Sequence, residues 1–216
     1  MAKIEDGVSS SILAGVDTTF KALRTTLRPQ ENLSWNSIGA QSGSITGIAA
    51  NGAVFSLRNI GTNNLIIRRV GCGVFIFTAF TTAQVVDFSL IVARSFTASD
   101  TGGTAIALTG NNCKHRTSLA TVTNIDCRIA TTAALTAGTK TLDTNTIGQT
   151  GGWSTGTANV IAPTLNNLFQ HDPSDYPLVL ATNEGINIQV LTAMGAAGVG
   201  RFYANIEFAE VTTASF

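Results

Sequence analysis

The sequence is poor in charged residues. Asp, Glu, Lys and Arg make up 12% of its 216 residues, against a usual share of ~25%, and 13 basic residues balance 13 acidic ones. Such a chain lacks the clustered positive excess of nucleic-acid-binding proteins, so we expect no nucleic-acid partner. With a mean hydropathy of +0.25, its surface must be largely Thr, Ser, Asn and Gly, or be covered by partners. The composition therefore predicts a protein that associates.

Long hydrophobic runs are also absent. The longest apolar stretch, Val70–Phe80, is too short for a membrane-spanning helix, which needs about 20 residues. Residues 1–15 carry Lys3, Glu5 and Asp6 and no apolar segment typical of a signal peptide. We therefore expect no membrane partner and synthesis in a reducing cytoplasm.

Cysteine and histidine are scarce. Cys72, Cys113 and Cys127 are odd in number and widely spaced, with no C-x-x-C pair, so we expect free thiols rather than disulfides or a zinc site. The only histidines are His115 and His171, which leaves little material for a metal centre or a Cys/His nucleophile. The sequence predicts neither a metal nor a cofactor.

Strand patterns dominate the middle and the end of the chain. In 84–94 apolar side chains occupy alternate positions, and Phe202–Phe208 shows the same period of two. Gly and Asn turns separate the segments, and no helical pattern lies between them. The expected strands are 53–60, 64–70, 73–80, 84–94, 177–182, 186–193 and 202–211. This pattern predicts an all-β protein, an antiparallel sandwich or barrel.

Residues 1–32 precede the first strong strand signal and form the first expected unit, an N-terminal arm; 33–216 form the second, a β-sandwich domain. Val16, Phe20, Leu23 and Leu27 have a spacing that one face of a helix could use. Threonine pairs and two glycines weaken a helix there, so an extended arm and a short helix both remain open. We expect these four apolar residues to contact another protein.

Residues 131–159 are rich in threonine and glycine and contain two charged residues, Lys140 and Asp143. A structureless loop of this length is uncommon unless it has a binding role, and a thin edge hairpin is the alternative. We expect this insertion, including Trp153, to take part in contacts between protomers or with a larger assembly.

One pattern resembles a catalytic motif. Gly152–Gly156 matches the G-x-S-x-G nucleophile turn, with Ser154 as the serine. That turn needs a helix after it and an acidic residue before the histidine, whereas His171 here precedes Asp172 and Asp175. We therefore expect no catalytic residue, and a flexible turn at this place.

Other candidates are equally incomplete. Asp143–Gly148 resembles the start of a calcium loop, but Ile147 stands where the fifth ligand oxygen is required. Residues 171–175 carry acidic oxygens, yet the prolines at 173 and 177 indicate a rigid turn. For the adjacent Arg68 and Arg69, strand alternation predicts that only one faces outward.

Both ends of the chain resemble virion proteins of tailed bacteriophages. The segments that carry the resemblance are Asp6–Asp17 and Lys21–Leu23 at the start, then Tyr176–Ile186, Ala193–Gly198 and Arg201–Val211 at the end. The Thr-rich region 131–159 has no counterpart. The resemblance implies a jelly-roll-like β-sandwich in a structural protein located in the virion and assembled in the host cytoplasm.

Within that class we expect a non-enzymatic capsid decoration (cement) protein that binds the major capsid protein or other virion proteins and forms a homo-oligomer, a trimer by analogy with other capsid decorations. A tail, neck or baseplate component is an alternative. A carbohydrate-binding module is another, although the possible sugar-stacking residues Trp35, Trp153, Tyr176 and Tyr203 are far apart in sequence.

Overall fold

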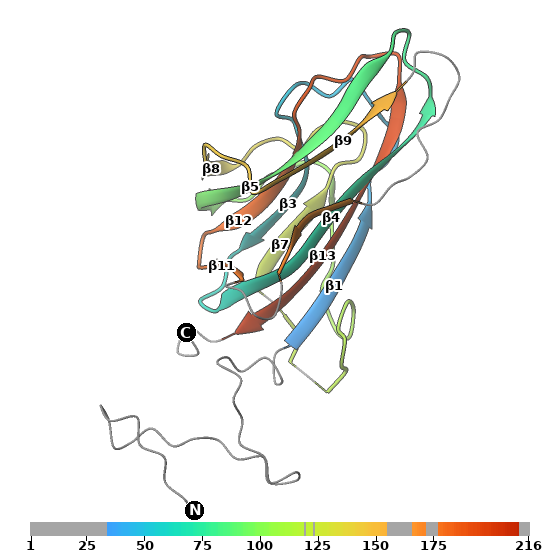
Figure 1. Ribbon diagram of the computed structural model, residues 1–216. Helices are drawn as coiled ribbons and strands as arrows, with labels where there is room; N and C mark the ends of the chain where they lie inside the picture. Colours follow the sequence, from blue (N-terminus) through green and yellow to red (C-terminus); the bar gives the residue numbers. More distant parts are fainter. Residues whose placement is uncertain (1–33, 119, 123, 155–165, 172–176, 212–216) are drawn as a thin grey trace, which may run out of the picture. The chain divides into compact units, whose positions relative to one another are not determined.

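The structure is a computed structural model that describes residues 34–118, 120–122, 124–154, 166–171 and 177–211. The expected arm at 1–32, with Val16, Phe20, Leu23 and Leu27, lies outside these residues. The described chain contains no helix and consists of two antiparallel sheets packed face to face (Figure 1). The predicted antiparallel β-sandwich is confirmed.

The first sheet has the strand order β1-β13-β4-β10, with β11 also paired to β4 and β2 to β13. Its strands are β1 Ser34–Gln41, β2 Ile45–Thr46, β4 Asn64–Thr78, β10 Asn166–Gln170, β11 Leu178–Leu180 and β13 Val199–Val211. The two strands expected at 64–70 and 73–80 form a single strand, β4, which ends at Thr78. β4 stays paired with β13 along its length, because Cys72, between Gly71 and Gly73, continues the alternation of side chains that face the core.

The second sheet has the order β6-β7-β3-β12-β5-β8, with β9 also paired to β5. Its strands are β3 Ala53–Asn59, β5 Gln84–Ala98, β6 Thr104–Ala105, β7 Ile125–Ile129, β8 Thr139–Leu142, β9 Gly148–Ser154 and β12 Gly185–Val190. The Thr-rich region 131–159 was expected to be a binding loop or a thin edge hairpin. Its described part contains β8 and β9, which both pair with β5, beside 93–98 and 84–90 respectively (Figure 1).

The principal strands define a jelly roll. The order β1-β13-β4-β10 in one sheet faces β3-β12-β5-β9 in the other, which is the arrangement of eight strands wound as two Greek keys. The core lies between the sheets, where the even-numbered apolar side chains of β5 meet those of β13. Phe88 and Phe202 are in edge-to-face contact there, with ring centroids 5.4 Å apart.

Arg68 and Arg69 correct the expectation that only one of them faces outward, because both are exposed. Glu207 of β13 pairs with Arg69 and Phe208 with Ile67, so Arg68 is an extra residue in β4. This is a β-bulge, which shifts the alternation by one residue. It allows both Ile67 and Val70 to face the core.

A long segment lies between β5 and β9, residues 99–147, of which 119 and 123 are not described; we call it the crossover insertion. It first adds β7 and β6 beside β3 and then returns to form β8 on the far side of β5. Under it, the outward-facing side chains of Asn187 and Gln189 in β12 are 0% and 3% exposed. The insertion therefore gives this sheet a buried polar layer on its outer face.

Candidate functional site

Asp100, which lies just beyond Ser99 after the end of β5, is a fully buried charged group. Its Oδ1 accepts hydrogen bonds from the Gly138 backbone N–H at 2.8 Å and from the Lys140 ammonium, and its Oδ2 accepts one from Asn187 Nδ2 at 3.0 Å. The Lys140 and Asp100 side chains are only 5% and 0% exposed. We call Asp100, Lys140 and Asn187 the Asp100 cluster.

Two opposing effects set the pKa of Asp100, burial and the hydrogen-bond donors around its carboxylate. Burial by itself raises the pKa of Asp100, but the Gly138 N–H, the Lys140 ammonium and the Asn187 amide outweigh it, so that the pKa is lowered. The Lys140 ammonium also lies 4.7 Å from the centroid of the Phe96 ring, which covers it on one side. A charged pair is thus held in a buried site by three hydrogen bonds to Asp100 and by the Phe96 ring.

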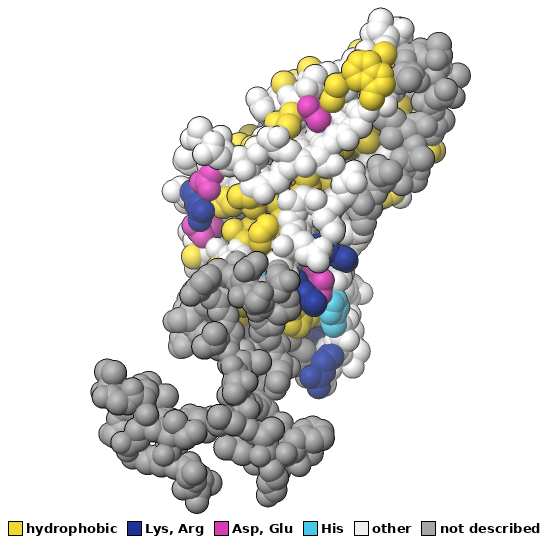
Figure 2. Space-filling view, viewed as in Figure 1, with side chains coloured by type: hydrophobic (Ala, Val, Ile, Leu, Met, Phe, Trp, Pro, Cys, Tyr) yellow, Lys and Arg dark blue, Asp and Glu magenta, His cyan; other side chains and the backbone are white. Residues whose placement is uncertain are grey.

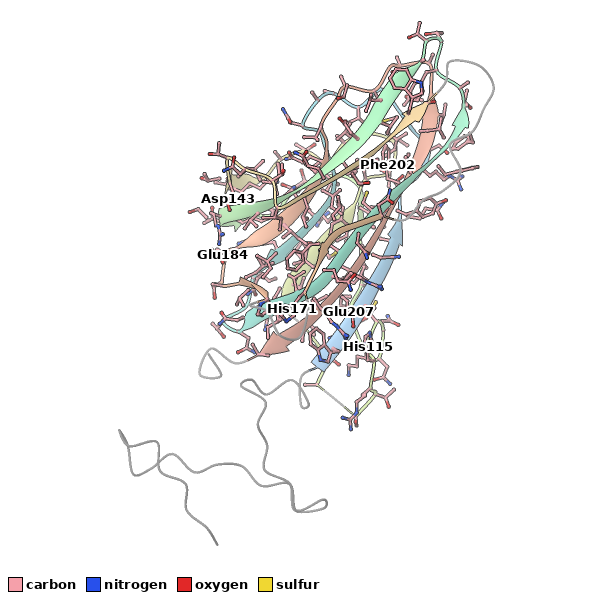
Figure 3. All side chains as sticks on the ribbon, in the orientation of Figure 1. His115, Asp143, His171, Glu184, Phe202 and Glu207 are labelled. Atoms are coloured by element: carbon pink, nitrogen blue, oxygen red, sulfur yellow. The ribbon has the colours of Figure 1, made fainter. Side chains whose placement is uncertain are left out.

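Sequence reasoning did not find this cluster. Lys140 stood out only as one of two charged residues in the Thr-rich region, and its true partner is 40 residues away at Asp100. Asp143, the other charged residue, instead pairs with Arg94 at 3.3 Å, and Arg94 pairs with Glu184 at 2.6 Å (Figure 3). Asp143 therefore belongs to an exposed ion-pair group rather than to a calcium loop.

Ser154, the serine of the G-x-S-x-G pattern, ends β9 and faces inward. Its side chain is 0% exposed, and its Oγ has no hydrogen-bond partner among the described residues. An exposed nucleophile on a strand-to-helix turn is therefore not formed here. His171 is also buried, after β10, while Asp172 and Asp175 lie outside the described residues.

Trp153, an expected contact residue, is the most exposed large hydrophobic side chain of the described chain, at 61%. It lies directly across the β5–β9 ladder from Val85, which is 37% exposed. Charged side chains are few on the face of the molecule in Figure 2. Trp153 is therefore accessible to a partner.

The first sheet carries a Ser–His pair that the sequence did not indicate. Ser37 Oγ of β1 and His115 Nε2 of the crossover insertion are 2.6 Å apart on the surface. Glu207, opposite Ser37 in the ladder, is bound by Arg68 at 2.9 Å (Figure 3). The Ser–His pair is exposed, and with the backbone hydrogen bonds from Ser37 to Cys113 and from His115 to Trp35 it fastens the insertion to β1.

The described aromatic residues do not form one sugar-stacking platform. Trp35 and Tyr203 lie toward opposite ends of the β1–β13 ladder, and Trp153 is in the other sheet. Tyr176 lies outside the described residues. Trp35 is partly buried, with the Arg68 guanidinium 5.6 Å from the centroid of its ring.

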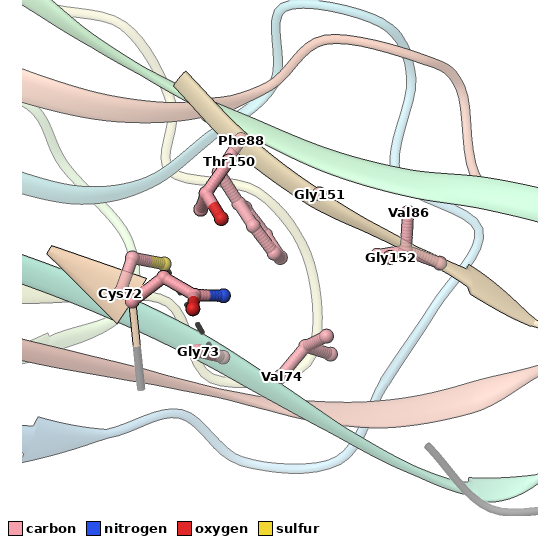
Figure 4. A pocket seen from close by; sticks show the side chains of 9 residues that line it. Cys72, Gly73, Val74, Val86, Phe88, Thr150, Gly151 and Gly152 are labelled. Carbon is pink, nitrogen blue, oxygen red and sulfur yellow. Dashed lines mark hydrogen bonds between the residues drawn. The ribbon is translucent and has the colours of Figure 1, made fainter. Parts of the chain in front are cut away.

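A small cavity lies between the sheets (Figure 4). Its volume is about 20 Å³, and it is lined on one side by Cys72 and Val74 of β4 and on the other by Phe88 of β5 and Thr150 of β9. A space of this size holds about one water molecule. It is too small to be a substrate pocket.

The fold defines the class: a double-sheet jelly roll with a crossover insertion. No protein-family model, no curated protein and no solved structure matches the chain. Among the described residues no group of three or more His, Cys, Asp or Glu side chains is placed to hold a metal ion, and no helix is long and apolar enough to cross a membrane.

Proposed function

We propose that this chain is a non-enzymatic structural protein of a tailed-bacteriophage virion, and specifically a capsid decoration protein that binds and stabilises the shell. The observation that carries the proposal is the jelly-roll strand order, which is shared by viral capsid and lectin domains. The resemblance of both chain ends to phage virion proteins favours the capsid over the lectin.

The surface chemistry supports association with other proteins. A chain with 12% charged residues presents mostly Thr, Asn, Ser and Gly, whose desolvation in a contact costs less than that of ions. The exposed Trp153 and Val85 add an apolar contact on the second sheet. The partners we propose are the major capsid protein and further copies of this chain, as a trimer.

A role in the tail, neck or baseplate would use the same fold and surface, and the location of the protein in the particle distinguishes the two. A carbohydrate-binding role has less support, because Trp35, Trp153 and Tyr203 do not lie together. The dispersal of these rings leaves no pair of adjacent aromatic faces among them for a sugar to stack on.

The test is imaging and binding with purified phage particles from the source of the sequence. We expect the protein to copurify with particles at a fixed stoichiometry and to appear as density on the outside of the shell. Density confined to the tail would show that the protein is a tail component and not a capsid decoration. Absence of the protein from intact particles would overturn the proposal.

The arm can be tested in the full-length chain with two matched sets of substitutions. The first replaces with Asp the four apolar residues expected to make contacts, Val16, Phe20, Leu23 and Leu27; the second replaces with Asp the four threonines Thr18, Thr19, Thr25 and Thr26. We expect the first set to lose at least tenfold in affinity for particles lacking the protein and the second to lose much less. Equal loss would mean that added charge, and not apolar contact, matters.

A further inference from the structure

We propose that Lys140 and Asn187 become joined by an intramolecular isopeptide bond, formed after folding with Asp100 as the acid–base group. Lys140 belongs to β8 and Asn187 to β12, and these strands flank β5 in the second sheet. The bond would fasten the end of the crossover insertion to a central strand of the jelly roll. This inference is independent of the virion role.

The geometry brings the two reacting groups together. The Lys140 ammonium and the Asn187 amide bind the two oxygens of one carboxylate, that of Asp100. One carboxylate therefore contacts both the amine and the amide. Such positioning replaces a bimolecular encounter and raises the effective concentration by orders of magnitude.

The second requirement is an uncharged amine, which transfer of a proton from Lys140 to Asp100 would supply. A lysine amine in water is protonated at neutral pH and cannot attack a carbonyl carbon. In the cluster, Asp100 and Asn187 are 0% exposed and the Lys140 side chain is 5% exposed. Because burial leaves both charges poorly solvated, transfer of a proton from Lys140 to Asp100, which yields a neutral amine and a neutral acid, costs less here than in water. Only a small fraction of molecules needs to hold the neutral pair at any time, because the departure of ammonia removes a product and drives the reaction to completion.

Asn187 is the acyl group that fits the site. Its Oδ1 is buried and has no hydrogen-bond partner among the described residues, whereas its Nδ2, the nitrogen that must leave, is bound to Asp100. Asp100 itself is held as a carboxylate by three donors, and a carboxylate is a poor electrophile. The amide carbon Cγ of Asn187 is therefore the one attacked.

The reaction balances without any other reagent. Lys140 Nζ gives a proton to Asp100, and its lone pair then forms a bond to Cγ of Asn187, giving a tetrahedral intermediate. Asp100 passes its proton to Nδ2 of Asn187 and takes one from Nζ. The Cγ–Nδ2 bond breaks, ammonia leaves, and Nζ and Cγ share an amide bond.

Mass spectrometry of the denatured full-length protein tests the proposal. We expect an intact mass below the sequence mass by one ammonia molecule, and a protease-derived branched peptide that joins Lys140 to Asn187. Acetylation under denaturing conditions should modify Lys3, Lys21 and Lys114 and leave Lys140 unmodified. A wild-type chain with the full sequence mass would overturn the proposal.

Variants separate this bond from other losses of ammonia. Lys140→Arg keeps the positive charge but removes the nucleophile, so its mass should equal its sequence mass. The matched control Lys114→Arg, outside the cluster, should still lose ammonia. If Lys140→Arg also loses ammonia, the source is cyclisation of an asparagine and the proposal is wrong. A folded Asp100→Asn chain should retain its ammonia, and loss from it would remove Asp100 from the mechanism.

Discussion

Gly148 and Gly152 lie on the same inward side of β9, opposite Leu90 and Val86, but their surroundings differ. A Cβ atom at Gly148 would collide with the Leu168 carbonyl group of β10, whereas a Cβ at Gly152 would have no atom within 4 Å. The first glycine is thus required for the approach of the two sheets, and the second is not.

We therefore predict that Gly148→Ala lowers the free energy of unfolding by about 1–3 kcal/mol, because the backbone of β10 must move. Gly152→Ala should be neutral or raise it by about 0.4–1 kcal/mol, since alanine restricts the unfolded chain. Urea unfolding of the two variants beside the wild type measures both. Similar losses in the two variants would show that β9 and β10 are not packed as described.

At the scale of elements, the bulge at Arg68 is an insertion that the sheet tolerates. Removing Arg68 would restore strict alternation between Ile67 and Val70, so both stay in the core. We predict that a chain lacking Arg68 folds. Its free energy of unfolding should fall by roughly 1–3 kcal/mol, because two interactions are lost: the ion pair with Glu207 and the hydrogen bond from the His171 backbone N–H to the Arg68 carbonyl.

The matched control is deletion of Gly73 in the same strand. That deletion places Cys72 and Val74 at successive positions, so one of the two buried side chains must turn outward. The control should fail to give a cooperative unfolding transition by circular dichroism. If the chain without Arg68 is equally unfolded, the bulge is an obligatory part of β4.

At the scale of the whole molecule, two cysteines report separately on the two sheets. Cys72 is in β4 of the first sheet and Cys127 in β7 of the second, and both are at most 1% exposed. Burial raises the pKa of Cys72 to about 12 and that of Cys127 well above its usual value. Neither thiol can react with a labelling reagent until the protein opens.

We predict that Cys72 and Cys127 react at the same slow rate in a Cys113→Ser chain, because the sheets share one core and part together. Time-resolved labelling followed by peptide mass spectrometry gives both rates, and denaturant should make both thiols react at once. Faster labelling of Cys127 alone would show that the β7 edge opens independently of the sandwich.

Much of the strand content could be predicted because it is local. The period of two in 84–94 and in 202–208 specifies which side chains face the core, whatever the partners of the strand are. Turn chemistry was equally local: Asn51 and Asn183, in the two Asn-containing turns, have positive φ values of 63° and 60°. β1, β7 and β10 were missed because their apolar alternation is weak.

The Asp100 cluster could not be predicted, because its members meet only after the sheets have formed. Asp100 and Asn187 are 87 residues apart, and Ser37 and His115 are 78 apart. Which of these polar side chains become neighbours depends on strand order and register.

The sequence by itself determined the antiparallel sandwich, the low share of charged residues and the free state of the cysteines, since composition and alternation act residue by residue. Only the tertiary structure decided that a crossover insertion extends the second sheet on both sides and that Lys140 and Asn187 meet at the buried carboxylate of Asp100. The reason is physical: alternation tells a strand which face to bury, but long-range pairing decides what that face meets.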